Sequence, residues 1–295
     1  MVKKALCILF VLCLLPFSAW AEEDILVNRL KNRKLASPFS ADAELLNIWF
    51  PHISGCDGAV LKCGDEVILI DACSVKQAKN ALMELLNGLN ITHINAVINS
   101  HPDPDHMGGI RVLLENGIGI DKIIVGFPRT GFENDENQRM QDLIYEWAEA
   151  YSVPVERMGN GDELSLGSAV IHMIQCLDES VYGVNNASMM CMVSFGERRA
   201  FFAADIQLET QKKLLSDEFD IDADILKFSH HGYRGVNEEY LQKISPLVTI
   251  LTGAAAGTTA SQSQLANFHY YYTTTEYFTL HLATDGQQWL LEAIN

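Results

Sequence analysis

Two periodicities alternate along the chain. Short apolar runs bounded by turn-forming residues predict strands, at residues 45–50, 59–62, 67–70, 96–99, 122–125, 170–174, 189–195, 200–204, 225–228, 247–251, 277–282 and 288–292. Apolar residues spaced three and four apart predict helices, at residues 75–87, from about 108, and at 134–151, 208–215 and 238–244. No internal stretch has the composition of a linker. Residues 41–295 are therefore expected to form one layered α/β domain.

The first 21 residues follow a different pattern. Lys3 and Lys4 precede an apolar stretch at 5–17, and Ala19 and Ala21 are small residues at the positions that a signal peptidase reads. About 13 apolar residues are too few to span a bilayer comfortably as a helix. We therefore expect a cleaved signal peptide at 1–21, a polar lead-in at 22–40, and a secreted or periplasmic protein without a stable membrane anchor. An uncleaved anchor is the alternative.

Acidic residues outnumber basic ones, 38 Asp and Glu against 21 Lys and Arg, which gives a formal net charge of −17. Loss of Lys3 and Lys4 with the signal peptide would bring this charge to −19. A surface this acidic repels polyanions unless a local basic patch overrides it, and the sequence shows no such patch. The charge therefore argues against long nucleic acids as partners, although it does not exclude them.

Potential metal ligands gather directly after the predicted strand at 96–99. Four of them fall within six residues, namely His101, Asp103, Asp105 and His106. The prolines between them restrict the backbone, and Gly108 and Gly109 follow. Imidazole and carboxylate together suit zinc, manganese or ferrous iron better than calcium or magnesium. A strand-end loop with this composition predicts a metal site.

Three further positions could complete such a site. Asp205 ends a predicted strand, although a lone aspartate there is more often a helix cap. His230 and His231 end the strand at 225–228, and a His pair can also be structural. Asp71, after the strand at 67–70, is better suited to orienting neighbouring groups or capping a helix than to binding metal.

The order of these segments resembles the metallo-β-lactamase superfamily. The run His101-Pro102-Asp103-Pro104-Asp105-His106 is similar to its H-x-H-x-D-H signature, and the segments ending at Asp71, Asp205 and Gly232 look like its other motifs. The H-x-D-x-D-H variant resembles the hydrolase domain of ComEC-type DNA-uptake proteins and exported phosphorylcholine esterases acting on teichoic acid. Gly55-Cys56-Asp57-Gly58-Ala59 is a loose version of that subgroup's first strand-turn. The resemblance implies a four-layered αββα sandwich.

The sequence departs from the superfamily at the first metal. Asp103 stands where the family has its second His, the third His is missing at 184–188, and only His101 remains. The resemblance assigns the second metal to Asp105, His106, Asp205 and a late His. We place His230 in that last role, because it lies nearer the strand end, and His231 as its neighbour or a proton donor. Asp103 and Asn186 could assist a weaker first metal, and Asp205 would bridge the two ions.

These residues predict an exported metal-dependent hydrolase that uses a metal-bound hydroxide, with one or two Zn²⁺ ions or Mn²⁺. Asp105 and His231 are the expected catalytic groups, and Tyr233 or Arg234 could assist the leaving group. A phosphodiester or other phosphoester, either small or linked to the cell wall, is the expected substrate. The alternatives are a lactone, thioester or β-lactam hydrolase, and a secreted binding protein whose reduced site does not turn over.

Overall fold

The structure is a computed structural model that describes residues 25–30, 35–132, 134–266, 270–276 and 279–294. The expected signal peptide at 1–21 lies outside these residues. In the part of the chain that is described, no helix has both the length and the apolar character needed to cross a membrane.

Strands from both ends of the chain build the first sheet. Its order among the described residues is β1-β18-β17-β2-β3-β4-β6-β8-β9. The strands are β1 (Leu26–Asn28), β2 (Leu46–Phe50), β3 (Gly58–Cys63), β4 (Glu66–Ala72), β6 (Ala96–Asn99), β8 (Ile123–Val125), β9 (Val155–Arg157), β17 (Thr279–Thr284) and β18 (Trp289–Ile294). β4, β6, β8 and β9 run parallel, so the chain crosses between them through helices.

The second sheet comes from the later part of the chain, in the order β10-β11-β12-β13-β14-β15-β16. Its strands are β10 (Glu163–Leu166), β11 (Ala169–Ile174), β12 (Met190–Phe195), β13 (Arg198–Phe202), β14 (Ile225–Lys227), β15 (Val248–Leu251) and β16 (Tyr270–Thr273). The last four of these strands run parallel. A small separate pair joins β5 (His93–Ile94) to β7 (Gly119–Ile120).

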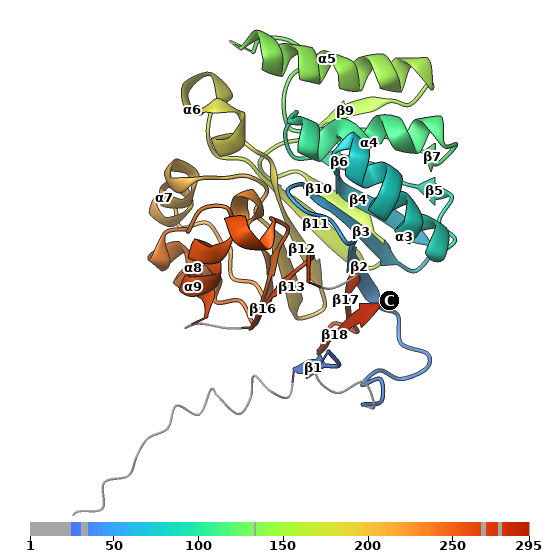
Figure 1. The fold of residues 1–295 in the computed structure, drawn as a ribbon, viewed down its shortest axis with the longest axis vertical. Helices are drawn as coiled ribbons and strands as arrows, with labels where there is room; N and C mark the ends of the chain where they lie inside the picture. Colours follow the sequence, from blue (N-terminus) through green and yellow to red (C-terminus); the bar gives the residue numbers. More distant parts are fainter. Residues whose placement is uncertain (1–24, 31–34, 133, 267–269, 277–278, 295) are drawn as a thin grey trace, which may run out of the picture.

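Helices cover the outer face of each sheet (Figure 1). Over the first sheet lie α2 (Val75–Gln77), the π-helical turn η1 (Ala78–Leu82), α3 (Met83–Gly88), α4 (Pro104–Glu115) and α5 (Asp135–Ala150). Over the second lie α7 (Leu208–Ser216), α8 (Glu238–Ile244) and α9 (Thr259–Leu265). The remaining helical segments are α6 (Glu179–Asn186), η2 (Ser229–Gly232) and η3 (Ala255–Gly257).

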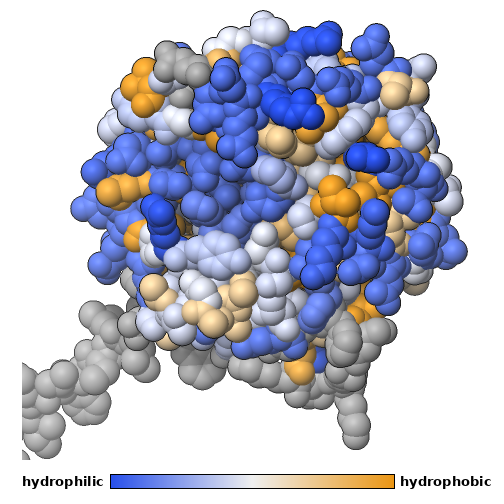
Figure 2. Space-filling model, turned by 45° about the horizontal axis from the view of Figure 1, so that its top comes forward, coloured by the Kyte–Doolittle hydropathy of each residue, from blue (hydrophilic) through white to orange (hydrophobic). Residues whose placement is uncertain are grey.

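Three apolar cores hold these layers together. Ile48, Leu61 and Val193 belong to the core between the two sheets, because alternate strand residues of both sheets face inward. Leu82 and Ile110 pack with the outer face of the first sheet, and Leu214 and Tyr240 pack with that of the second. The predicted four-layered αββα sandwich is confirmed. Hydrophilic side chains cover most of the face in Figure 2, with hydrophobic ones in scattered groups.

The structure differs from the sequence pattern in two places that matter for the site. The helix expected from about residue 108 begins at Pro104, so Asp105 and His106 lie in its first turn rather than in a loop. Proline tolerates the first helical position because its missing N–H has no partner there in any case. Part of the expected lead-in also belongs to the sheet, since β1 pairs with β18.

Candidate metal centre

The candidate residues meet where strands of both sheets end. Asp71 lies in β4, and Asp105 and His106 follow β6. From the second sheet, Asp205 follows β13, and His231 follows β14. The carboxyl ends of parallel strands share one edge, so residues far apart in sequence converge there. All of the predicted motifs therefore reach one edge of the sandwich.

The close approach of α4 to β4 requires glycine. A Cβ on Gly109 would lie 1.8 Å from the Ala72 carbonyl oxygen, and one on Gly108 would lie 2.9 Å from the Val75 nitrogen. No side chain fits at the first of these distances. The two glycines that follow the His/Asp segment therefore let the first turn of α4 lie against the end of β4, which brings His106 to Asp71.

His106 is completely buried and is held from one side of its ring. Its Nδ1 lies 2.8 Å from Asp71 Oδ2, and Asp71 is itself fixed by the backbone N–H of Ser100 (2.8 Å) and by the Ser100 hydroxyl (2.8 Å). The opposite nitrogen, Nε2, lies 3.3 Å from Asp205 Oδ1. A carboxylate on Nδ1 fixes the orientation of an imidazole and leaves Nε2 available as a metal ligand.

His231 repeats this arrangement from the second sheet. Its Nδ1 lies 3.0 Å from Asp57 Oδ1 and 3.1 Å from Thr252 Oγ1. Its Nε2 faces Asp105 Oδ2 at 3.1 Å and Asp205 Oδ2 at 3.3 Å. Two carboxylate–histidine pairs thus present their Nε2 atoms to the carboxylate of Asp205, with Asp105 beside one of them.

The arrangement fits a metal ion. Asp57, His106, Asp205 and His231 are buried, and ligand atoms from all four lie within 4.8 Å of one another. Within the described residues, His106 Nε2 and Asp205 Oδ1 have no hydrogen-bond partner despite their burial. Buried polar atoms are nearly always paired, so this orphaned pair is the signature of a group that binds between them. Asp57 contacts the Nδ1 side of His231, so it is better placed to orient that ring than to ligate.

At this edge, contacts between acids and imidazoles lower the pKa values of the acids and raise those of the imidazoles. Burial alone would raise the pKa of Asp205, but His106 and His231 outweigh it and hold that pKa well below its usual range. Burial would also raise the pKa of Asp105, but the hydrogen bond from His231 outweighs it, and the pKa falls to about 2. Burial would lower the pKa of His106, yet Asp205 and Asp71 raise it well above its usual value. Burial would likewise lower the pKa of His231, which Asp205 and Asp105 raise.

We expect the metal-free protein to lose stability as pH rises above 6.5, the ordinary pKa of histidine. The raised pKa values of His106 and His231 contribute to the free energy of unfolding fully below the ordinary value of 6.5, and this contribution disappears as pH rises through the raised values. Metal must displace the same protons, so metal affinity should increase over this range. Thermal melting of the metal-free and zinc-loaded protein checks both signs. A metal-free protein that melts higher at about pH 9 than at about pH 6 would contradict them.

The residues expected at a first metal lie together beside His106. The rings of His101 and His106 have centroids 4.1 Å apart, and His101 Nε2 is buried without a hydrogen-bond partner in the described chain. Asp103, the N-cap residue of α4, places Oδ2 3.5 Å from His101 Nε2. Asn186 is engaged elsewhere, because its Oδ1 accepts hydrogen bonds from Gln207 N and Thr210 Oγ1, both at 3.0 Å.

His230 occupies a more open position than His231. Its Nε2 lies 3.6 Å from Asp205 Oδ2, its Nδ1 lies 3.4 Å from Gln207 Nε2, and its side chain is 24% exposed. It lines a cavity of about 280 Å³ that Glu209 and Arg234 also line. We expected His230 to be the ligand because it lies nearer the strand end, whereas the structure places His231 within the cluster. The Tyr233 hydroxyl accepts from Ala254 N at 3.4 Å.

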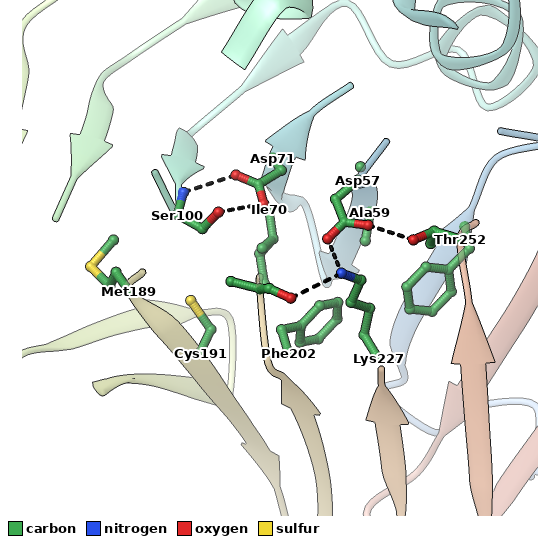
Figure 3. A pocket seen from close by; sticks show the side chains of 13 residues that line it. Asp57, Ala59, Ile70, Asp71, Ser100, Met189, Cys191, Phe202, Lys227 and Thr252 are labelled. Carbon is green, nitrogen blue, oxygen red and sulfur yellow. Dashed lines mark hydrogen bonds and ion pairs between the residues drawn. The ribbon is translucent and has the colours of Figure 1, made fainter. Parts of the chain in front are cut away.

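Polar groups line the floor beneath this cluster, between the two sheets (Figure 3). The Lys227 amine contacts the Asp57 carboxylate and lies 3.3 Å from the Ala204 carbonyl oxygen. Burial lowers the pKa of Lys227 well below its usual range. Apolar side chains such as Phe202 begin directly below, so the metal centre rests on the sandwich core.

Backbone strain is concentrated at the same edge. Asp71 (φ 55°), Ala204 (φ 48°), His230 (φ 49°) and His231 (φ 57°) all adopt left-handed conformations. Residues other than glycine avoid this region, and each occurrence costs about 1–3 kcal/mol, which the surrounding structure must offset. Such strain is typical of functional sites, where the required direction of a side chain outweighs the conformational energy of the backbone.

Fold and site together define a metallohydrolase scaffold, and the model of the metallo-β-lactamase superfamily matches residues 59–250. The chain belongs to this superfamily, whose members are generally metal-dependent hydrolases. Over 175 residues it is 24% identical to ComE operon protein 3 of Bacillus subtilis (strain 168). That match covers 59% of this chain and only 22% of the relative, and it agrees with the ComEC-type resemblance.

Solved structures support the fold. The metallo-β-lactamase fold protein YhfI of Bacillus subtilis is 15% identical, with a TM-score of 0.54 over 81% of this chain and 100% of that one. A CmlA β-hydroxylase mutant is 11% identical, with a TM-score of 0.54 over 84% of this chain and 55% of that one. Because one neighbour is named a hydroxylase, the fold alone does not fix the activity.

Sequence reasoning assigned no role to three residues of the site. Asp57 stood inside the recognised strand-turn, but nothing in that turn indicated a contact with a His some 170 positions later. Lys227 stands in a predicted strand between apolar neighbours, and Thr252 directly follows the predicted strand at 247–251. For Lys227, one signal was available, since a lysine within an apolar strand pattern must find a partner when the strand is buried.

Proposed function

We propose that this protein is an exported metal-dependent phosphodiesterase or related phosphoester hydrolase that holds one divalent ion, Zn²⁺ or Mn²⁺. The observation that carries the proposal is the convergence of the Nε2 atoms of His106 and His231 on Asp205. We take these three residues and Asp105 as the ligands. A second ion at His101 and Asp103 would bind more weakly, because fewer protein ligands converge there.

A metal bound there supplies Lewis acidity, which activates water and polarises a phosphoryl oxygen. The chain's own residues prepare the site. Asp71 and Asp57 hold the two imidazoles by Nδ1, and Asp105, which its low pKa keeps ionised, can hold the attacking water by accepting a hydrogen bond from it. Burial of His106, Asp205 and His231 strengthens each electrostatic contact among them.

A phosphoester is favoured over a lactone, thioester or β-lactam by the surroundings of His230. Arg234 lines the adjoining cavity and makes no ion pair with the described part of the chain. In a chain with a net charge of −17, an uncommitted guanidinium next to a metal centre offers a specific partner for phosphoryl oxygens. The ComEC-type relative supports the same branch of the superfamily.

The test is metal analysis of the purified protein, combined with hydrolysis of bis-p-nitrophenyl phosphate, p-nitrophenyl phosphorylcholine and nitrocefin. We expect about one tightly bound metal per chain and chelator-sensitive turnover of at least one phosphoester. Turnover of nitrocefin alone would favour the alternative specificity. A protein that retains no metal and hydrolyses none of the three would be better described as a binding protein.

A further inference from the structure

Lys227 is the last residue of β14 and lies beneath the proposed metal site rather than in it. Its side chain is only 3% exposed. The amine contacts the Asp57 carboxylate and lies 4.0 Å from Asp205 Oδ1. Burying an amine is costly unless it is paired, so these contacts must offset that cost. Figure 3 shows the contacts of this amine with Asp57 and with the Ala204 carbonyl oxygen at the floor of the site.

Asp57 connects the lysine to the proposed ligands. Its Oδ1 accepts a hydrogen bond from Thr252 Oγ1 at 2.6 Å and lies 3.0 Å from His231 Nδ1, while its Oδ2 meets the Lys227 amine. Its backbone N–H donates to the Asp105 carbonyl oxygen at 3.1 Å. Donors at the ends of β14 and β15 therefore fix both oxygens of the carboxylate that holds His231.

The second carboxylate–histidine pair is fixed differently. Asp71, which holds His106, takes its hydrogen bonds from the backbone and hydroxyl of Ser100. Those donors come from the same sheet, because Ser100 directly follows β6, which pairs with the strand β4 that carries Asp71. Asp57, in contrast, directly precedes β3 of the first sheet, and the side chains that hold it lie at the ends of β14 and β15 of the second. The Lys227 contact thus ties the two sheets together at the edge where both contribute proposed metal ligands.

We propose that Lys227 is a positioning residue for the metal centre: by holding Asp57 it fixes the ring of His231, and so sets the affinity for the divalent ion. This inference rests on the proposed function, because it takes His231 as a ligand. It requires a hydrogen bond to Asp57 and no contact between Lys227 and substrate.

A purely electrostatic role makes the opposite prediction. A positive charge 4.0 Å from Asp205 would repel a divalent cation, so its removal would tighten metal binding. Loss of a positioning contact weakens binding instead, because His231 is then free to turn away. The direction of the change in metal affinity therefore separates the two roles.

The experiment compares Lys227→Met and Thr252→Val with the unmodified protein by Zn²⁺ titration against a chelating indicator and by the visible spectrum of the Co²⁺ form. Partners that orient a metal ligand typically contribute 10–100-fold to metal affinity, so we expect a loss of about that size in Lys227→Met and about tenfold in Thr252→Val. The Co²⁺ band should change in both. Thr249→Val is the matched control, since Thr249 is buried on β15 and its Oγ1 has no partner among the described residues.

If the unmodified protein binds no metal, the proposed function fails and this inference fails with it. If it binds metal and Lys227→Met binds as tightly or more tightly, the positioning role is wrong while the metal site stands. Should Lys227→Met not fold, Thr252→Val decides, because it removes the neighbouring donor to the same carboxylate without a change in charge. An affinity equal to that of Thr249→Val would then overturn the inference.

Discussion

Asp205→Asn is expected to lower the affinity for Zn²⁺ by more than about 100-fold and to remove phosphoester turnover. Asparagine keeps the shape of the side chain but removes the negative charge that faces the Nε2 atoms of both His106 and His231. Those atoms would then face a neutral amide, which is a poor metal ligand by comparison. Equilibrium dialysis with metal analysis measures the first effect, and steady-state hydrolysis measures the second.

Asp224→Asn is the matched control for this change. Asp224 directly precedes β14, at the end of that strand away from the site, and accepts hydrogen bonds from Arg198, from the Arg199 backbone and from Trp289 Nε1. Its replacement should cost stability without changing metal stoichiometry. If Asp224→Asn lost metal as completely as Asp205→Asn, general unfolding rather than ligand loss would explain both results.

His231→Ala and His230→Ala are expected to differ by at least about tenfold in metal affinity, with the larger loss for His231. His231 is buried, with one nitrogen on Asp57 and the other facing Asp105 and Asp205. His230 lies at the border of the cavity, and among the described residues its nearest carboxylate partner is Asp205, with Oδ2 3.6 Å from its Nε2. Zn²⁺ titration of both variants under one condition measures the difference directly.

The reverse order of affinities would restore His230, the residue nearer the strand end, as the ligand. The two variants also serve as each other's control, because both remove an imidazole from adjacent positions with similar backbone strain. Any cost that comes from the strained turn itself therefore cancels in the comparison.

The alternating strand and helix patterns were sufficient to predict a layered α/β domain, and the resemblance to the superfamily added the expectation of four layers. The ligand-rich segment at 101–106 could be placed at a strand end from the same patterns. The exact start of α4 could not, since Pro104 was expected to stiffen a loop and is instead the first residue of the helix. Asp105, His106 and Asp205 were identified from their order in the chain, and the structure brings them to one edge.

The sequence could not show which of His230 and His231 faces the other candidate ligands, and the reason is physical. Both residues have positive φ in the turn η2, so neither follows the alternation by which strand residues point to opposite faces. Distance from the strand end therefore says little about direction. Asp57 was missed because its role depends on pairing across sheets, which local pattern does not encode. Whether each of these residues ligates metal remains a prediction.

The left-handed residues at the ends of β4, β13 and β14 have a consequence for how the molecule opens. Strained strand ends release energy when they relax, so local opening should cost less free energy at this edge than in the apolar cores. A ligand that binds only the closed arrangement opposes that release and adds its own binding free energy. Resistance of the fold to heat and proteases would then depend on the concentration of metal in the surroundings, and the protein would be degraded faster where metal is scarce.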